Sequence, residues 1–135
     1  MHIAYLSIGT NLGDRQQNLL SAIDRIGESV GTILRCSSFL ETEPWGFESD
    51  NAFLNAAVCV GTSLTPHELL AATQRIEREM GRRHKSVNAE YHDRIIDIDI
   101  LLYDDVTVST PDLVIPHPLM GQRDFVMIPL REILD

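Results

Sequence analysis

Asp97 and Asp99 are the residues whose types and spacing point most directly to chemistry. They alternate with isoleucines in RIIDIDILLY, residues 94–103. In a β-strand, side chains two apart share a face, so both carboxylates would lie on one face with Cα atoms about 6.7 Å apart. Carboxylates so close repel each other unless a cation lies between them, and Mg²⁺ takes such ligands together with substrate phosphates. The pair therefore indicates either a magnesium site for phosphoryl chemistry or a solvated strand face.

A basic, polar segment precedes this strand. Residues 82–94 hold four of the 11 lysines and arginines, and residues 82–93 show no helical or strand periodicity. Guanidinium groups bind phosphate through paired donors, which makes Arg82 and Arg94 candidate phosphate ligands. The segment is either a functional lid that closes on a polyphosphate or an ordinary solvated loop.

Three further polar groups are candidates for the same site. His117 lies between two prolines, and Arg123 follows six residues later. A histidine in so restricted a backbone could donate to phosphate, transfer a proton or serve a structural role. Gln74 and Glu77 are three apart on a predicted helix, at the edge of its apolar stripe, where they could face a cleft or simply cover the helix surface.

Other residues fit the recognition of a flat heterocycle. The side-chain amide of Asn55 offers a donor and an acceptor side by side. Phe53, Phe125 and Trp45 could stack on a ring, or could be ordinary core aromatics. The turn GTNLGD lacks the phosphate-loop patterns and is read as a tight turn before a capped helix.

The elements that must position these residues follow from periodicity and capping signals. Asp14 fits the N-cap of a first helix, and Thr65, followed by Pro66 and Glu68, fits the N-cap of a second helix that ends at Gly81. The strands are expected over residues 2–8, 32–42, 53–63 and 94–103, with a final short helix over 125–134. This β-α-β-β-α-β order predicts a single α+β domain over residues 1–135. Its fold would be ferredoxin-like, with a mainly antiparallel sheet and helices packed on one face.

Composition narrows the function class. The chain has 135 residues, 44% of them hydrophobic, and a formal net charge of −9. This acidity argues against general binding to nucleic acid, and the apolar runs are too short to span a membrane. The start of the chain reads as a strand and not as a signal peptide. Cys36 and Cys59, without CxxC spacing, are expected to be buried thiols in a reducing compartment such as the cytoplasm. A monomer is expected, because no apolar stripe is evident.

Taken together, these stretches resemble the 6-hydroxymethyl-7,8-dihydropterin pyrophosphokinase family. The matching motifs stand in family order and cover nearly the whole chain: AYLSIGTNLGD, SSFLETEPWG, FLNAAV, ELLAATQRIEREMGR, RIIDIDILLY and IPHPLMGQRDFV. The resemblance implies an enzyme of folate biosynthesis that transfers pyrophosphate from ATP, its co-substrate, to the hydroxymethyl group of a dihydropterin and releases AMP.

The resemblance also implies residue roles. Asp97 and Asp99 match the aspartates that hold two Mg²⁺ ions, and Arg82, Arg94 and His117 would supply donors to the reacting phosphates. The pterin would be bound by Thr42, Trp45, Phe53, Asn55 and Phe125. The nucleotide and its phosphates would be bound by Gln74, Glu77, Arg82, Arg94, Ile98, His117 and Arg123.

The chain departs from the family pattern at Tyr91-His92-Asp93, at Pro118 and by stopping soon after PLREIL. Two other functions stay open. A nucleotide hydrolase would consume ATP without a pterin acceptor, and a ligand-binding regulatory module would bind pterin or nucleotide without releasing AMP.

Overall fold

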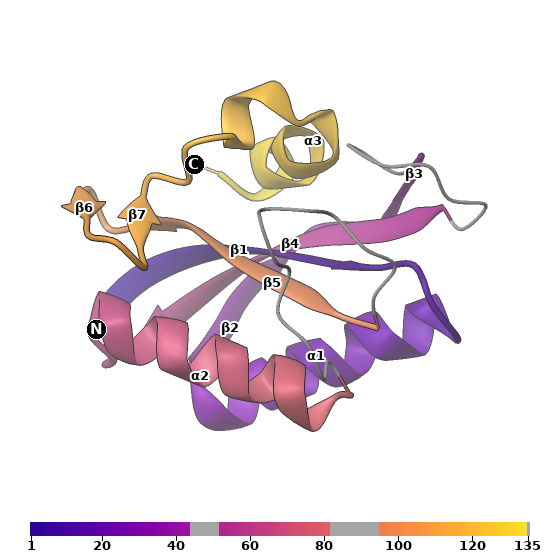
Figure 1. Ribbon diagram of the computed structural model, residues 1–135, viewed down its shortest axis with the longest axis horizontal. Coiled ribbons are helices and arrows are strands. Elements are labelled where there is room, and N and C mark those ends of the chain that lie inside the picture. Colours follow the sequence, from indigo (N-terminus) through magenta and orange to yellow (C-terminus); the bar gives the residue numbers. More distant parts are fainter. Residues whose placement is uncertain (44–51, 82–94, 135) are drawn as a thin grey trace.

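A five-stranded antiparallel sheet organises the molecule (Figure 1). The computed structural model describes residues 1–43, 52–81 and 95–134. In chain order the elements are β1 (His2–Thr10), α1 (Arg15–Ser29), β2 (Gly31–Cys36), β3 (Leu40–Thr42), β4 (Phe53–Thr62), α2 (Pro66–Glu79), β5 (Asp97–Tyr103), β6 (Val108–Ser109), β7 (Val114–Ile115), the 3-10 turn η1 (Met120–Gln122) and α3 (Asp124–Ile133).

The strand order is β2-β4-β1-β5, with β3 paired to the start of β4. Each β-α-β unit is thus split by a strand of the other unit, which is the arrangement of the predicted fold class. Figure 1 shows α1 and α2 together on one face of the sheet, as predicted, and α3 alone on the opposite face. The prediction of one long strand over residues 32–42 is corrected, because the structure divides it into β2 and β3.

The interruption between β2 and β3 has a local cause. The Ser37 N–H still donates to the Ala57 carbonyl at 2.9 Å, but the Ala57 N–H donates to the Ser37 hydroxyl at 2.8 Å instead of to a backbone carbonyl, and that hydroxyl donates to the Ser38 carbonyl at 2.9 Å. The Ser38 N–H and hydroxyl both donate to the Glu132 carboxylate in α3, at 2.7 and 2.8 Å. Side chains therefore take over the backbone's hydrogen bonds where the strand bends away.

Two hydrophobic clusters lie on opposite faces of the sheet. The larger one lies under α1 and α2 and contains Ile96, Ile98 and Ile100, as the alternation with the aspartates predicts. The smaller one joins Ala57, Cys59 and Leu101 to the apolar face of α3. Cys59 is buried, but the prediction of a buried thiol is wrong for Cys36, which is exposed at the end of the outermost strand β2.

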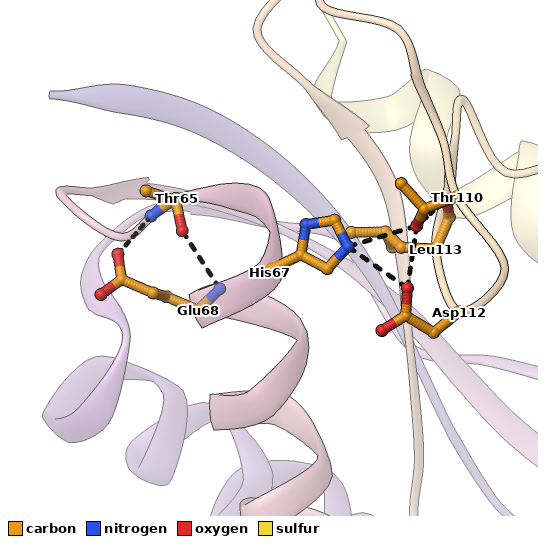
Figure 2. Close-up of polar contacts among 6 residues, drawn as sticks. All are labelled: Thr65, His67, Glu68, Thr110, Asp112 and Leu113. Atoms are coloured by element: carbon orange, nitrogen blue, oxygen red, sulfur yellow. Dashed lines mark hydrogen bonds and ion pairs between the residues drawn. The ribbon is translucent and has the colours of Figure 1, made fainter.

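The capping signals read from the sequence are present at both long helices. The Asp14 carboxylate accepts the Gln17 N–H at 3.1 Å. At α2, Thr65 accepts the Glu68 N–H at 3.2 Å, and the Glu68 carboxylate accepts the Thr65 N–H at 2.8 Å (Figure 2). Helix α2, which carries Gln74 and Glu77, therefore begins at a fixed point.

Figure 2 also shows how the β6–β7 hairpin is held to the start of α2. His67 Nε2 lies 3.2 Å from the Thr110 hydroxyl and 3.3 Å from Asp112 Oδ1, and the Thr110 hydroxyl donates to Asp112 at 2.8 Å. The Thr110 hydroxyl also lies 3.2 Å from the Leu113 carbonyl. Since β7 leads directly to His117, these contacts place the following segment beside the sheet.

No helix in the described part of the chain has the length and apolarity needed to cross a membrane.

We expect Thr65→Ala to destabilise the protein by about 1 kcal/mol, since the N-cap acceptor for the Glu68 N–H is lost. For a chain of this size, that loss corresponds to a Tm lower by about 4 °C. Thermal unfolding followed by circular dichroism checks the prediction, with the exposed Thr107→Ala as control. Equal Tm values for the two variants would show that the capping box does not stabilise α2.

Candidate active site

The centre of the candidate site is a row of three residues across the sheet, one from each of three strands. Gly9 in β1 lies opposite Asn55 in β4 and opposite Asp97 in β5. Directly opposite residues share a face, and strands lie about 4.8 Å apart, so Asn55 and Asp97 are about 10 Å apart at Cα. In the next row Ser7 lies between Ala57 and Asp99. Both predicted carboxylates therefore share the α3 face with the predicted pterin-binding amide.

Gly9 keeps the space between Asn55 and Asp97 open. A Cβ atom built at this position would lie 2.9 Å from Asn55 Oδ1 and 3.7 Å from the Phe53 ring. Any side chain would have to displace the amide. The sequence analysis missed both Gly9 and Ser7; a glycine inside a strand is a signal that another group approaches closely, and it could have identified Gly9.

The amide of Asn55 is held by the strand beside it. Its Nδ2 donates to the Thr42 hydroxyl at 2.7 Å and to the Leu40 carbonyl at 3.3 Å. Asn55 is 2% exposed, so these bonds orient a nearly buried group. With Nδ2 turned toward β3, the acceptor Oδ1 is directed toward Gly9 and the open part of the row, where it can accept an N–H from a ligand.

Two of the three predicted ring-binding aromatics lie on this face. Phe53 precedes Asn55 by two residues in β4, and half-buried Phe125 lies in the first turn of α3. The Arg123 guanidinium carbon lies 5.7 Å from the centre of the Phe125 ring, within cation–π distance. Burial lowers the pKa of Arg123, yet a guanidinium keeps its charge throughout the physiological range. The start of α3 thus brings an aromatic surface and a positive charge together.

Part of the predicted nucleotide-binding set lies at the outer edge of β5. The Ile98 N–H donates to Glu77 Oε2 at 2.8 Å, and Glu77 is 7% exposed. Because N–H and C=O of a strand residue point to the same side, the Ile98 carbonyl also faces this edge. The Ile98 side chain lies in the core, so only its main chain is directed toward the edge. Gln74, half-buried, lies one turn before Glu77 on α2.

His117 lies against the same edge of β5. Its N–H donates to the Leu101 carbonyl of β5 at 3.0 Å. Its Nδ1 accepts the Leu119 N–H at 3.3 Å, so a neutral ring carries its proton on Nε2. Burial lowers the pKa of His117, partly opposed by the charge of Asp97. The ring is therefore a neutral Nε2–H donor near Asp97 at neutral pH.

The donor set at Asp97 and Asp99 fits Mg²⁺. Both side chains are partly exposed on one strand face, opposite Gly9 and the hydroxyl-bearing Ser7. Hard oxygen ligands, one or two carboxylates from the protein, are what Mg²⁺ takes when phosphates supply the remainder. Among residues 1–43, 52–81 and 95–134, no group of three or more His, Cys, Asp or Glu side chains gathers as a closed metal site. Asp97 and Asp99 can therefore form an open metal site, in which the remaining coordination positions are left for phosphate oxygens of a ligand.

Three predicted site residues, Trp45, Arg82 and Arg94, lie outside the described residues, as does the departure at Tyr91-His92-Asp93. The structure brings the other predicted residues to the α3 face and the outer edge of β5. Pro118, the second departure, is exposed beside His117.

Comparison with known proteins connects this geometry to a family. Residues 5–135 match the family described as 7,8-dihydro-6-hydroxymethylpterin-pyrophosphokinase (HPPK). The chain belongs to the HPPK family. A Porphyromonas gingivalis protein named 2-amino-4-hydroxy-6-hydroxymethyldihydropteridine pyrophosphokinase is 52% identical over 134 residues, covering 98% of this chain and 91% of that protein. A Bacillus subtilis protein of the same name is 42% identical over 133 residues, covering 98% of this chain and 78% of its own.

Solved structures agree on the fold. A crystal structure of HPPK-DHPS in complex with substrates matches with a TM-score of 0.75 and 17% identity, over 98% of this chain and 40% of that chain. A Plasmodium falciparum HPPK-DHPS structure matches with a TM-score of 0.76 and 19% identity, over 98% of this chain and 41% of that chain. At such low identity these likenesses show the fold alone. They confirm the predicted ferredoxin-like α+β class for this HPPK family member.

The hydrogen bond from Ile98 to Glu77 gives a prediction that separates geometry from charge. Glu77→Ala leaves a buried backbone N–H without its acceptor, which costs about 1–3 kcal/mol and loosens β5 beside Asp97 and Asp99. We expect a lower Tm and an increased KM for ATP. Glu77→Gln keeps an oxygen acceptor and is expected to stay within about twofold of the parent KM, on the same hydrogen-bond reasoning.

Thermal unfolding and steady-state kinetics of both variants check this expectation. Glu79→Ala, which removes an exposed carboxylate from the same helix, serves as control. If the Gln variant loses as much as the Ala variant, the negative charge of Glu77 matters more than its hydrogen bond to β5.

Proposed function

We propose that this protein transfers pyrophosphate from ATP to the hydroxymethyl group of 6-hydroxymethyl-7,8-dihydropterin and releases AMP, a step of folate biosynthesis. The row Asn55–Gly9–Asp97 carries the proposal. It supports the binding of a flat heterocycle at one end and of phosphate chemistry at the other, about 10 Å away, which is two strand spacings. Family membership and the names of the Porphyromonas and Bacillus relatives support the same reaction.

The pterin side of the site uses hydrogen bonding and stacking. Asn55 Oδ1 would accept an N–H of the pterin, while Thr42 holds the amide from behind. Phe53 and Phe125 would stack on the ring, and Trp45 is proposed as a further contact on the strength of the resemblance. Because Asn55 is buried, a ring edge without a matching N–H would leave Oδ1 without a donor, which favours the correct heterocycle.

The nucleotide side lies along β5. Gln74, Glu77 and the main chain of Ile98 would border the nucleotide, with His117 and Arg123 donating to its phosphates. Arg82 and Arg94 are proposed as further phosphate ligands because their positions match the family motif. A chain with net charge −9 needs such local positive groups to hold a polyphosphate.

The metal requirement is part of the proposal. Asp97 and Asp99 would hold Mg²⁺, with two ions proposed as in the resembling family. When bound, Mg²⁺ would neutralise charge on the phosphate oxygens. Holding two carboxylates on one rigid strand is what the chain itself contributes to this site.

The reaction is an in-line displacement at the β-phosphorus. The pterin hydroxyl oxygen forms a bond to the β-phosphorus, the bond from that phosphorus to the bridging α–β oxygen breaks, and AMP leaves with the oxygen. The hydroxyl proton passes to solvent. Transfer of this kind depends mainly on positioning and charge stabilisation, for which the His117 Nε2–H and the Arg123 guanidinium are suited.

The proposal also covers the extent of the domain, the oligomeric state, the cellular location and the partners. Residues 1–135 would act as one pyrophosphokinase domain, as a monomer in the cytoplasm, with small molecules and not nucleic acid or membranes as partners. The strongly acidic composition supports the exclusion of nucleic acid.

The test is AMP release from ATP and Mg²⁺, measured with and without 6-hydroxymethyl-7,8-dihydropterin. We expect AMP only with the pterin, in equal amount to the pterin diphosphate, and none after chelation of Mg²⁺. Asp97→Ala should lower kcat by at least about 100-fold, because charge stabilisation of the transferred group is lost.

Asp105→Ala removes an exposed carboxylate just beyond β5 and should behave as the parent. AMP or ADP formed without pterin would indicate a nucleotide hydrolase. Ligand binding without AMP would indicate a regulatory module. A near-normal rate for Asp97→Ala would contradict the metal assignment.

A further inference from the structure

The guanidinium group of Arg15 joins three segments that meet beside the pterin side of the site. Arg15 is the first residue of α1. Its Nη1 donates to the Ala52 carbonyl at 2.9 Å and lies 2.8 Å from Glu41 Oε1. Glu41 is the middle residue of β3, and Ala52 immediately precedes β4. One side chain from α1 therefore holds both strands at the end where their pairing stops.

Arg15 occupies a position that helix energetics disfavour. The first turn of α1 contains no acidic residue, and a cation near the partial positive charge of a helix N-terminus is unfavourable. The Asp14 carboxylate at the N-cap and the contacts with Glu41 and Ala52 offset this effect.

The turn that precedes α1 fixes the position of Arg15. Asn18 Nδ2 donates to the Leu12 carbonyl at 2.8 Å and to the Thr10 hydroxyl at 3.2 Å, which ties α1 back to β1. Gly13 has a φ of +68°, a conformation that other residues rarely adopt. The turn GTNLGD thereby positions the start of α1 against β3 and β4.

The strand that Arg15 holds is the one that orients Asn55. β3 has three residues, with Leu40 opposite Asn55 and Thr42 opposite Phe53. The Asn55 amide donates to the Leu40 carbonyl and the Thr42 hydroxyl. So short a strand has few ladder bonds of its own, and its position depends on additional contacts.

We propose that Arg15 is a positioning residue for pterin binding. By joining Glu41 to Ala52 it keeps β3 in register with β4, and so holds the Asn55 amide with Oδ1 toward the open row. This inference rests on the function proposed above. It predicts that loss of Arg15 weakens pterin binding and leaves nucleotide binding, which lies along β5, unchanged.

The experiment measures two dissociation constants for each protein by isothermal titration calorimetry. The probes are a non-hydrolysable ATP analogue with Mg²⁺, and 6-hydroxymethyl-7,8-dihydropterin titrated into protein saturated with that analogue and Mg²⁺. For Arg15→Ala we expect pterin binding about tenfold weaker, equivalent to losing one or two net hydrogen bonds, and analogue binding within twofold of the parent. Steady-state kinetics should show a raised KM for the pterin with a nearly unchanged KM for ATP.

Arg25→Ala is the matched control. Arg25 lies ten residues, about 15 Å, farther along the same helix. It makes an exposed ion pair at 3.4 Å with Glu79 of α2 and not with β3. Both of its dissociation constants should stay within twofold of the parent. Arg15→Lys and Glu41→Gln, which weaken the junction without removing it, should give intermediate pterin affinities, and they carry the test if Arg15→Ala does not fold.

The outcomes distinguish this inference from the proposed function. A parent protein that binds no pterin would overturn the function itself. A parent that binds pterin, with Arg15→Ala equal to Arg25→Ala, would overturn the positioning role alone. Equal weakening of both ligands in Arg15→Ala and Arg15→Lys, with a lowered Tm, would also overturn it, because it would show general destabilisation.

Discussion

The register of β1 with its two neighbours is the constraint on which the site depends. Gly9 lies opposite both Asn55 and Asp97, so a single residue of β1 sets the amide and the carboxylate in one row. Because side chains alternate in a strand, a slip of one residue would turn either group toward α1 and α2. The register is held by burial on the other face, where Leu6 and Ile8 are fully buried. Packing of the apolar core therefore determines which face of the sheet the polar site residues lie on.

The α3 face is divided between packing and chemistry. Leu101 lies on this face together with Ala57 and Cys59, under α3, whereas the row at Gly9 carries polar groups. A bulge in β5, between the partners of Tyr5 and Leu6, brings Leu102 to the same cluster and turns Tyr103 into the opposite core. Strand β5 thus presents carboxylates at one end and an apolar surface at the other, and α3 covers the apolar part.

Local signals made much of this predictable from the sequence. The caps at Asp14 and Thr65, the alternation of Asp97 and Asp99 with isoleucines, and the order of elements all depend on neighbours along the chain. The break after Cys36 was not predictable, because the Ser38 N–H is satisfied by Glu132, a residue 94 positions away. The bulge in β5 was missed for a related reason, since it exists only in relation to β1.

The candidate site divides in the same way. The side chains proposed to touch substrates were identifiable by type and spacing, and the resemblance assigned them roles. The hydrogen bonds that support them were not identifiable, because the bond between Glu77 and Ile98 joins two elements, and Arg15 contacts Glu41 and Ala52 across the fold. Gly9 was recognisable in principle, but only its register shows what approaches it.

The position of the site at the edge of the sheet has a physical consequence. β5 is an outer strand, and the polar main-chain groups of such a strand invite pairing with another chain unless something covers them. Here Glu77 accepts the Ile98 N–H and the His117 N–H donates to the Leu101 carbonyl. The residues proposed to border the nucleotide therefore also protect the edge. Loss of the Glu77 side-chain acceptor would therefore loosen β5 and weaken ligand binding together, whereas the His117 ring can be replaced while its main-chain bond to β5 remains.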